Sequence, residues 1–138
     1  MHHFFLDTNV VFDYLGQREP NGAAAAALFQ AAHENQAVLY VASLSFSHVF
    51  YTLRKQFGPG PAREALRKLA RLVRVVAVDD AVVQAALASE FVDVEDAMQY
   101  FAAQTVPALA ALVTGDAKGF TAGSLTVVSP LAAQQMLT

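Results

Sequence analysis

The chain has 138 residues, of which 55% are hydrophobic, and it contains no cysteine. This length and composition fit one domain with a single packed core, spanning residues 1–138, and they exclude a disordered chain. The lack of cysteine excludes disulfides, thiolate nucleophiles and cysteine-based zinc sites. The formal net charge of −3 argues against a protein that coats nucleic acid through bulk electrostatics.

No apolar run reaches the roughly 18 residues that a membrane-spanning helix needs. The alanine-rich stretch from Ala23 to Ala32 has polar residues on both sides. The first residues, Met1-His2-His3, lack the positively charged segment and long apolar stretch of a secretory signal. We therefore expect a soluble, cytoplasmic protein.

Short apolar runs alternate with segments of helical spacing along the whole chain. The runs are continuously apolar, which is typical of strands buried on both faces, and they lie at His3–Leu6, Val38–Ala42, Val73–Val78, Leu109–Val113 and Leu125–Val128. The helical segments are Gly22–Glu34, Phe46–Phe57, Ala62–Arg71, Ala81–Glu90, Glu95–Thr105 and Leu131–Leu137, with a turn predicted over Gly58-Pro59-Gly60-Pro61. This alternation predicts an α/β fold, a three-layer α/β/α sandwich with a central parallel sheet.

Three aspartates stand at the ends of predicted elements. Asp7 and Asp116 follow apolar strands, and Asp96 lies at the start of a helix. In an open parallel sheet, residues just past the carboxyl ends of strands meet in one crevice, so these acids are expected to be neighbours. Gathered carboxylates raise one another's pKa values unless a cation offsets their charge. The pattern therefore favours a divalent metal site and phosphoryl chemistry.

Each of these acids also has a purely structural interpretation. Asp7 is placed to cap the helix that follows it, and Thr8 and Asn9 are either capping residues or hydrogen-bonding partners of a ligand. Asp93 is expected to be an N-cap, with Asp96 in the first helical turn, where the helix dipole favours negative charge. Asp116 is equally placed to cap a loop.

The order of the acids along the chain resembles that of the PIN-domain ribonucleases, which include the VapC-type toxins of toxin–antitoxin modules. The matching segments are Phe5–Asn9, Asp93–Tyr100, Leu112–Asp116 and Lys118–Phe120. The resemblance implies a Mg²⁺- or Mn²⁺-dependent endoribonuclease that cleaves single-stranded RNA. It implies Asp7, Asp96 and Asp116 as the catalytic, metal-binding acids, with Thr114 and Asn9 supporting them. It also implies an antitoxin partner.

One position departs from the family pattern. The family usually carries a glutamate early in the helix after the second strand, and the aligned residue here is His48. An imidazole ligates Mn²⁺ or softer metals but brings no negative charge for Mg²⁺. His48 is therefore a metal ligand, a residue at the edge of the core or a donor to phosphate, and its pKa near neutrality makes any such role sensitive to pH.

Seven of the nine basic residues lie between Arg54 and Arg74. Arg63, Arg67 and Arg71 recur every four residues, as on one helix face, which is either a solvated face or a surface that faces phosphate groups. Aromatic residues of the preceding helix either pack in the core or form a surface for an antitoxin or a homodimer; they are Phe46, Phe50, Tyr51 and Phe57.

Two other functions remain open at this stage. One is a phosphatase of the haloacid dehalogenase type, which also begins with an aspartate after the first strand. That chemistry needs a second aspartate two residues later, where this chain has Asn9, so covalent catalysis by Asp7 is disfavoured. The other is a catalytically degenerate PIN-like module that binds RNA or a protein partner, which His48 and the negative net charge favour.

Overall fold

The computed structural model describes residues 1–138 and contains a five-stranded, all-parallel sheet in the order β3-β2-β1-β4-β5. The strands are β1 (His2–Leu6), β2 (Ala37–Ala42), β3 (Val73–Val76), β4 (Ala111–Val113) and β5 (Val127–Val128). Leu6, the last residue of β1, pairs with Val41 of β2 on one side and Val113 of β4 on the other. β1 is therefore central, and the chain reverses its direction of winding at this strand.

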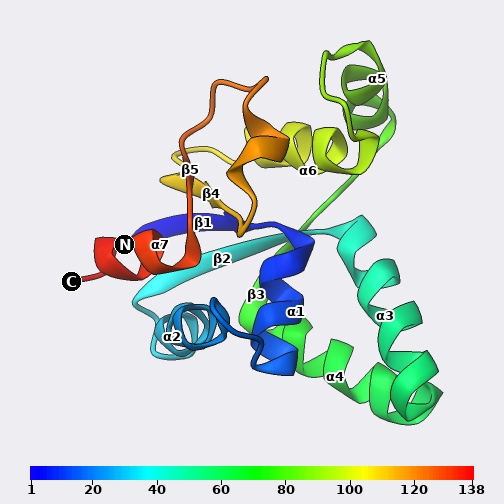
Figure 1. Cartoon of the computed structure of the whole chain (residues 1–138), viewed down its shortest axis with the longest axis vertical. Coiled ribbons are helices and arrows are strands. Elements are labelled where there is room, and N and C mark those ends of the chain that lie inside the picture. The colour runs from blue at the N-terminus through cyan, green and yellow to red at the C-terminus, as the bar shows by residue number, and fades with distance from the viewer.

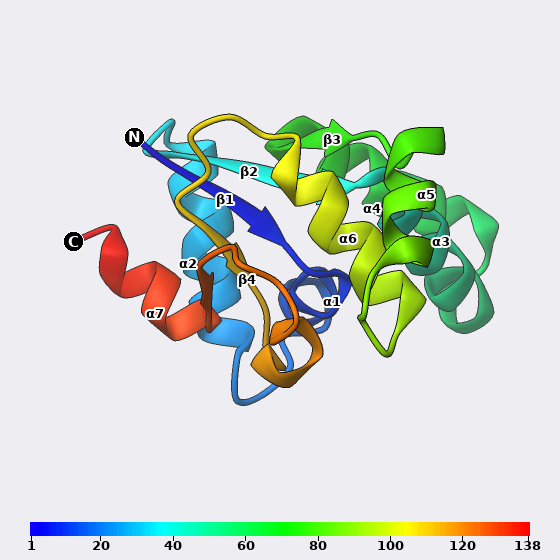
Figure 2. The same cartoon turned by 90° about the horizontal axis from the view of Figure 1, so that it is seen from above.

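Helices cover both faces of the sheet, as the sequence predicts (Figure 1). One face carries α1 (Thr8–Gly16), α2 (Gly22–His33), α3 (Ser43–Phe57), α4 (Pro59–Leu72) and α7 (Pro130–Met136). The other carries α5 (Asp80–Ala88), α6 (Val94–Gln104) and the 3₁₀ turn η1 (Ala117–Phe120). Figure 2, seen from the side of α5 and α6, shows α6 lying across the sheet. None of the helices combines the length and the apolar character that crossing a membrane requires.

Successive side chains of each strand enter opposite cores. In β1, Phe4 and Leu6 pack against α1 and α2, whereas Phe5 packs with Tyr100 of α6 and Phe120 of η1. All three β1 side chains are fully buried. This two-sided burial explains why the strand sequences are continuously apolar instead of alternating.

The predicted strands and helices form, with ends that differ by a few residues. The predicted turn at Gly58-Pro59-Gly60-Pro61 is shorter than expected, because only Gly58, with φ 87°, separates α3 from α4 and Pro59 already begins α4. Proline is tolerated in a first helical turn, where the backbone N–H has no intrahelical partner. The helix expected after Asp7 extends to Gly16, a range that the sequence analysis did not delimit.

Tyr100 fastens the segment after η1 to α6. Its hydroxyl oxygen accepts hydrogen bonds from the backbone N–H groups of Ser124, at 2.5 Å, and Leu125, at 3.0 Å. Gly123 lies against the Tyr100 ring so closely that a Cβ atom there would overlap it. The helix that begins near Asp96 and the segment that follows Asp116 are thereby held together.

We expect Tyr100→Phe to lower the free energy of unfolding by about 1–2 kcal/mol, because two backbone donors lose their acceptor while the ring stays in place. Urea denaturation measures this change. Tyr51→Phe is the matched control, since the Tyr51 side chain is 56% exposed and its hydroxyl makes no hydrogen bond in the structure. A Tyr100→Phe protein as stable as the control would contradict this role of the hydroxyl.

Candidate functional site

Asp7 lies at the carboxyl end of β1 and is only 4% exposed. Its backbone N–H donates to the Val113 carbonyl oxygen at 2.9 Å, which extends the pairing of β1 with β4 by one residue. Asp7 occupies the N-cap position of α1, but its carboxylate makes no capping hydrogen bond. Instead it accepts a hydrogen bond from Thr114 Oγ1 at 2.8 Å. Helix capping therefore does not account for this acid.

Thr114, just past the end of β4, connects two of the three acids. While its hydroxyl donates to Asp7, its oxygen accepts a hydrogen bond from the backbone N–H of Asp116 at 3.1 Å. Thr114 is 2% exposed, whereas Asp116 is exposed at the start of η1 and its side chain caps nothing. One buried hydroxyl thus orients the carboxylate of Asp7 and the backbone at Asp116.

Asp96 approaches from α6. Its backbone N–H donates to Asp93 Oδ1 at 2.9 Å, which confirms Asp93 as the N-cap. A Cβ atom added to Gly119 would lie 2.5 Å from Asp96 Oδ2, so the carboxylate sits directly against the turn that follows Asp116. A cavity of about 360 Å³ opens here, and its wall includes Asp96, Gly119 and Lys118.

Burial and nearby negative charges raise the pKa values of Asp96 and Asp7. Burial is the largest cause that raises the pKa of Asp96 to about 6. Four nearby negative charges raise it further, those of Asp7, Asp93, Glu95 and Asp116. Burial also raises the pKa of Asp7, although the hydrogen bond from Thr114 opposes this shift. The charges of Asp7 and Asp116 thus act on Asp96, which connects the three predicted acids.

A buried polar network behind Asp7 was missed by the sequence analysis. The side-chain oxygen Oε1 of Gln99 accepts hydrogen bonds from the Thr8 backbone N–H at 2.9 Å and from Thr8 Oγ1 at 3.2 Å. Thr8 Oγ1 also lies 2.6 Å from Ser45 Oγ of α3. The spacing in the sequence could have indicated Gln99, because it follows Asp96 by three residues and therefore lies on the same helix face. This network joins α1, α3 and α6 behind the acids.

Asn9 and His48 lie at the protein surface. Asn9 is exposed in the first turn of α1, two residues after Asp7, and its side chain makes no hydrogen bond. His48 is exposed on α3, so it is not part of the core. Its Nδ1 lies 3.2 Å from Glu95 Oε1, and its ring contacts the Phe12 ring edge-on with centroids 5.3 Å apart.

The donor atoms of this site fit a hard divalent cation, because carboxylate oxygens are the ligands that Mg²⁺ and Mn²⁺ prefer. No group of three or more acidic or histidine side chains lies close enough together to hold an ion by itself. Mg²⁺ is usually held by one or two protein carboxylates and keeps several water molecules. Asp7, Asp96 and Asp116 therefore suit a hydrated ion that some of them contact through water.

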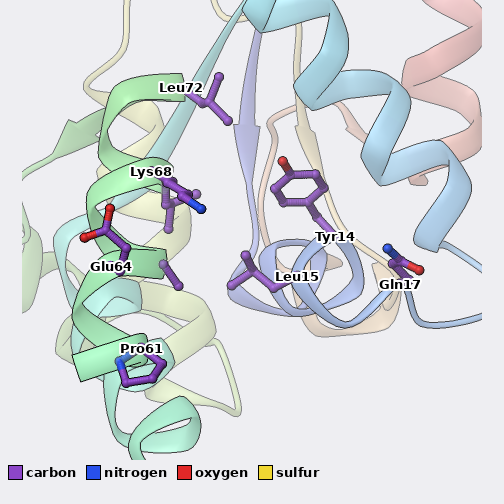
Figure 3. A pocket seen from close by; sticks show the side chains of 9 residues that line it. Tyr14, Leu15, Gln17, Pro61, Glu64, Lys68 and Leu72 are labelled. Atoms are coloured by element: carbon purple, nitrogen blue, oxygen red, sulfur yellow. The ribbon is translucent and has the colours of Figure 1, made fainter. Parts of the chain in front are cut away.

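A larger cavity, of about 530 Å³, lies between α1 and α4 and contains none of the three acids. Figure 3 shows Tyr14 and Leu15 on one side of it and Lys68 and Leu72 on the other. Glu64 is the only carboxylate in its wall. This cavity therefore lacks the cluster of acids that metal-assisted chemistry needs.

The predicted basic face is present on α4. Arg63, Arg67 and Arg71 are all exposed, and Arg67 Nη1 lies 3.4 Å from Glu64 Oε2. None of these arginines lines the cavity beside Asp96. Contact of this face with phosphate groups stays a prediction.

Comparison with known proteins identifies relatives of this fold. A family model described as a PIN domain matches residues 3–118. No curated protein sequence matches the chain.

Three solved structures illustrate the likeness. VapBC2 from Rickettsia felis, bound to a DNA fragment from its promoter, has a TM-score of 0.69 and 12% identity, covering 92% of this chain and 98% of that chain. DNA-bound VapBC from Salmonella typhimurium has a TM-score of 0.69 and 16% identity over 94% and 99%. VapC20 of Mycobacterium tuberculosis, a sarcin-ricin loop cleaving toxin, has a TM-score of 0.62 and 17% identity over 87% and 98%. These likenesses confirm the fold.

We expect Asp96→Asn to change how stability depends on pH. The folded protein holds the Asp96 proton up to a pKa of about 6, whereas the unfolded chain releases it near 3.8. The folded state therefore binds more protons between these values, and this group makes wild-type stability fall as the pH rises through them. Asparagine removes the titration.

The Asp96→Asn protein should be more stable than wild type by about 1 kcal/mol at pH 8, after allowance for solvent screening of this half-buried group, and nearly equal to it at pH 4. Urea denaturation at both pH values, with a chelator present, measures the difference. The same stability difference at pH 4 and pH 8 would show that Asp96 has an ordinary pKa.

Proposed function

Because the chain belongs to the PIN-domain family, we propose that it is a metal-dependent endoribonuclease that cleaves single-stranded RNA and acts as the toxin of a toxin–antitoxin pair. The observation that carries this proposal is the grouping of Asp7, Asp96 and Asp116 at the end of β1, with raised pKa values for Asp7 and Asp96. Burial and the nearby negative charges make ionised carboxylates costly at this site, and a bound cation offsets that cost.

A divalent cation supplied to this site would lower the pKa of a water molecule and offset the charge that grows on the phosphate during cleavage. The residues of the chain would bind this cation and orient its ligands. The hydrogen bond from Thr114 Oγ1 orients the Asp7 carboxylate. Asp96 lies in the first turn of α6 and Asp116 at the start of η1, and no protein nucleophile is required.

A basic side chain beside these acids would help to bind the RNA strand. Lys118 lines the cavity that contains Asp96, so its ammonium group is placed to attract a backbone phosphate. The cluster alone would repel RNA, and Lys118 offsets part of this repulsion. We propose that the exposed arginines of α4 act farther along the strand. An RNA substrate implies action in the cytoplasm.

A partner protein is part of the same proposal. The similar structures from Rickettsia felis and Salmonella typhimurium are VapBC complexes bound to DNA, which supports an antitoxin for this chain. On α3, Tyr51 and Phe57 are 56% and 63% exposed. Exposed aromatic side chains of this kind offer a surface to an antitoxin or to a second copy of the chain.

A catalytically degenerate module that binds RNA or a protein is the second candidate. The observation that favours it is His48, because α3 contributes no acid to the crevice at this position. One fewer negative charge weakens the attraction for a divalent cation by a few kcal/mol at the effective dielectric of a protein surface. Cleavage assays separate the two candidates.

We expect Asp7→Asn to reduce Mn²⁺-dependent cleavage of single-stranded RNA to below about one hundredth of the wild-type rate, since changes even beyond the direct ligands of a metal site cost 10–100-fold. The asparagine oxygen still accepts the Thr114 hydrogen bond, so the fold should persist. Without metal at neutral pH, the variant should be as stable as wild type or more stable, because burial raises the pKa of Asp7.

Asp80→Asn is the matched control for this assay. Asp80 begins α5, is exposed, and accepts only from Gln84 Nε2 at 3.3 Å. It should keep full activity. Equal cleavage by wild type and Asp7→Asn would remove Asp7 from the catalytic site.

A further inference from the structure

Glu95 and His48 meet across the crevice. Glu95 lies in the first turn of α6, next to Asp96, and His48 lies in the second turn of α3. His48 Nδ1 is 3.2 Å from Glu95 Oε1, and the two side chains are 45% and 44% exposed. The His48 ring also contacts the Phe12 ring of α1 edge-on. The histidine is thus oriented toward a carboxylate on another helix.

Glu95 is also electrostatically close to the buried acid. The charge of Glu95 contributes to raising the pKa values of both Asp7 and Asp96. Ser45, one turn before His48 on α3, contacts Thr8, the residue after Asp7, with 2.6 Å between the two hydroxyl oxygens. The contact between Glu95 and His48 therefore lies beside the segment that carries Asp7. Glu95 is thus a fourth acid near the crevice. It belongs to α6, whereas the family pattern has its fourth acid on the helix that corresponds to α3.

Building on the proposed function, we propose that Glu95 supplies the fourth carboxylate of the metal centre from α6, and that His48 is a positioning residue that holds Glu95 in place. A neutral imidazole with its proton on Nδ1 donates to Glu95 Oε1 and adds no charge of its own. In this arrangement the imidazole of α3 does not contact the metal. The acid that α3 lacks is replaced by one from the neighbouring helix.

The stability of the fold does not depend on this pair. An exposed pair of this kind contributes about 0.2–1 kcal/mol to stability. Glu95→Gln keeps the length of the side chain and its helix propensity. Variants at both positions are therefore expected to fold, and their metal affinity is interpretable.

Calorimetric titration of the full chain with Mg²⁺ and with Mn²⁺ at pH 8, where histidine is neutral, tests this proposal without any activity assay. Glu95→Gln should weaken Mg²⁺ binding on the order of tenfold, because it removes one negative charge near the ion. Glu34→Gln is the matched control. Glu34 is exposed at the end of α2, before β2 and hence at the opposite edge of the sheet, and this variant should bind like wild type.

A double-mutant cycle then separates the two roles of His48. If His48 positions Glu95, His48→Ala weakens the binding of Mg²⁺ and of Mn²⁺ equally, and it has no further effect on affinity in a protein that already carries Glu95→Gln. His48→Gln, which keeps an N–H donor, should restore most of the affinity. If His48 is itself a ligand, His48→Ala weakens Mn²⁺ binding more than Mg²⁺ binding, and this effect persists in a protein that already carries Glu95→Gln. That result would overturn the proposal.

Asp7→Asn, titrated in the same series, distinguishes this inference from the function on which it rests. If Asp7→Asn loses affinity while Glu95→Gln binds Mg²⁺ like wild type, the metal site stands and the role of Glu95 is wrong. If Asp7→Asn also binds like wild type, or wild type binds no metal, both proposals fall. Loss of affinity in Asp7→Asn and Glu95→Gln, but not in Glu34→Gln, is the expected result.

Discussion

The burial of one carboxylate, that of Asp7, is the constraint on which the rest of the site depends. A charged group that is 4% exposed loses most of its hydration, and this loss is costly unless polar partners or a cation replace the water. Thr114 provides one such partner from β4. Because Thr114 and Asp7 follow paired strands, the register between β1 and β4 places donor and acceptor together.

Helix α6 contributes to the surroundings of the buried Asp7 carboxylate in two ways. Its first turn brings Asp96 and Glu95 to the crevice, and one turn later Gln99 fills the buried space beside Thr8 with hydrogen bonds. The adjacent Tyr100 holds the segment after Asp116. One helix, apolar toward the sheet and polar at its first turn, therefore positions Asp96 relative to Asp7 and to the segment after Asp116. No buried polar side chain in the structure is left without a hydrogen-bond partner.

The sequence was sufficient for the fold and for locating the three aspartates at the ends of strands and helices, because continuous apolar runs and acids at their ends are local patterns; their catalytic role stays a prediction. Nothing in the sequence singled out Glu95, whose position in a first helical turn has an adequate explanation in the helix dipole. Only the folded structure brings Glu95 of α6 within 3.2 Å of His48 on α3. Lys118 was visible only as part of a family-like segment, since its place in the cavity depends on how η1 folds back toward Asp96.

Crystals of the full chain soaked in Mn²⁺ test the central claim most directly, because anomalous scattering locates the ion independently of activity. The account predicts a peak in the crevice at the carboxyl end of β1, contacted directly or through water by Asp7, Asp96 and Asp116, and absent in crystals of Asp7→Asn. A peak elsewhere, or no peak in the crevice at saturating Mn²⁺, would contradict it.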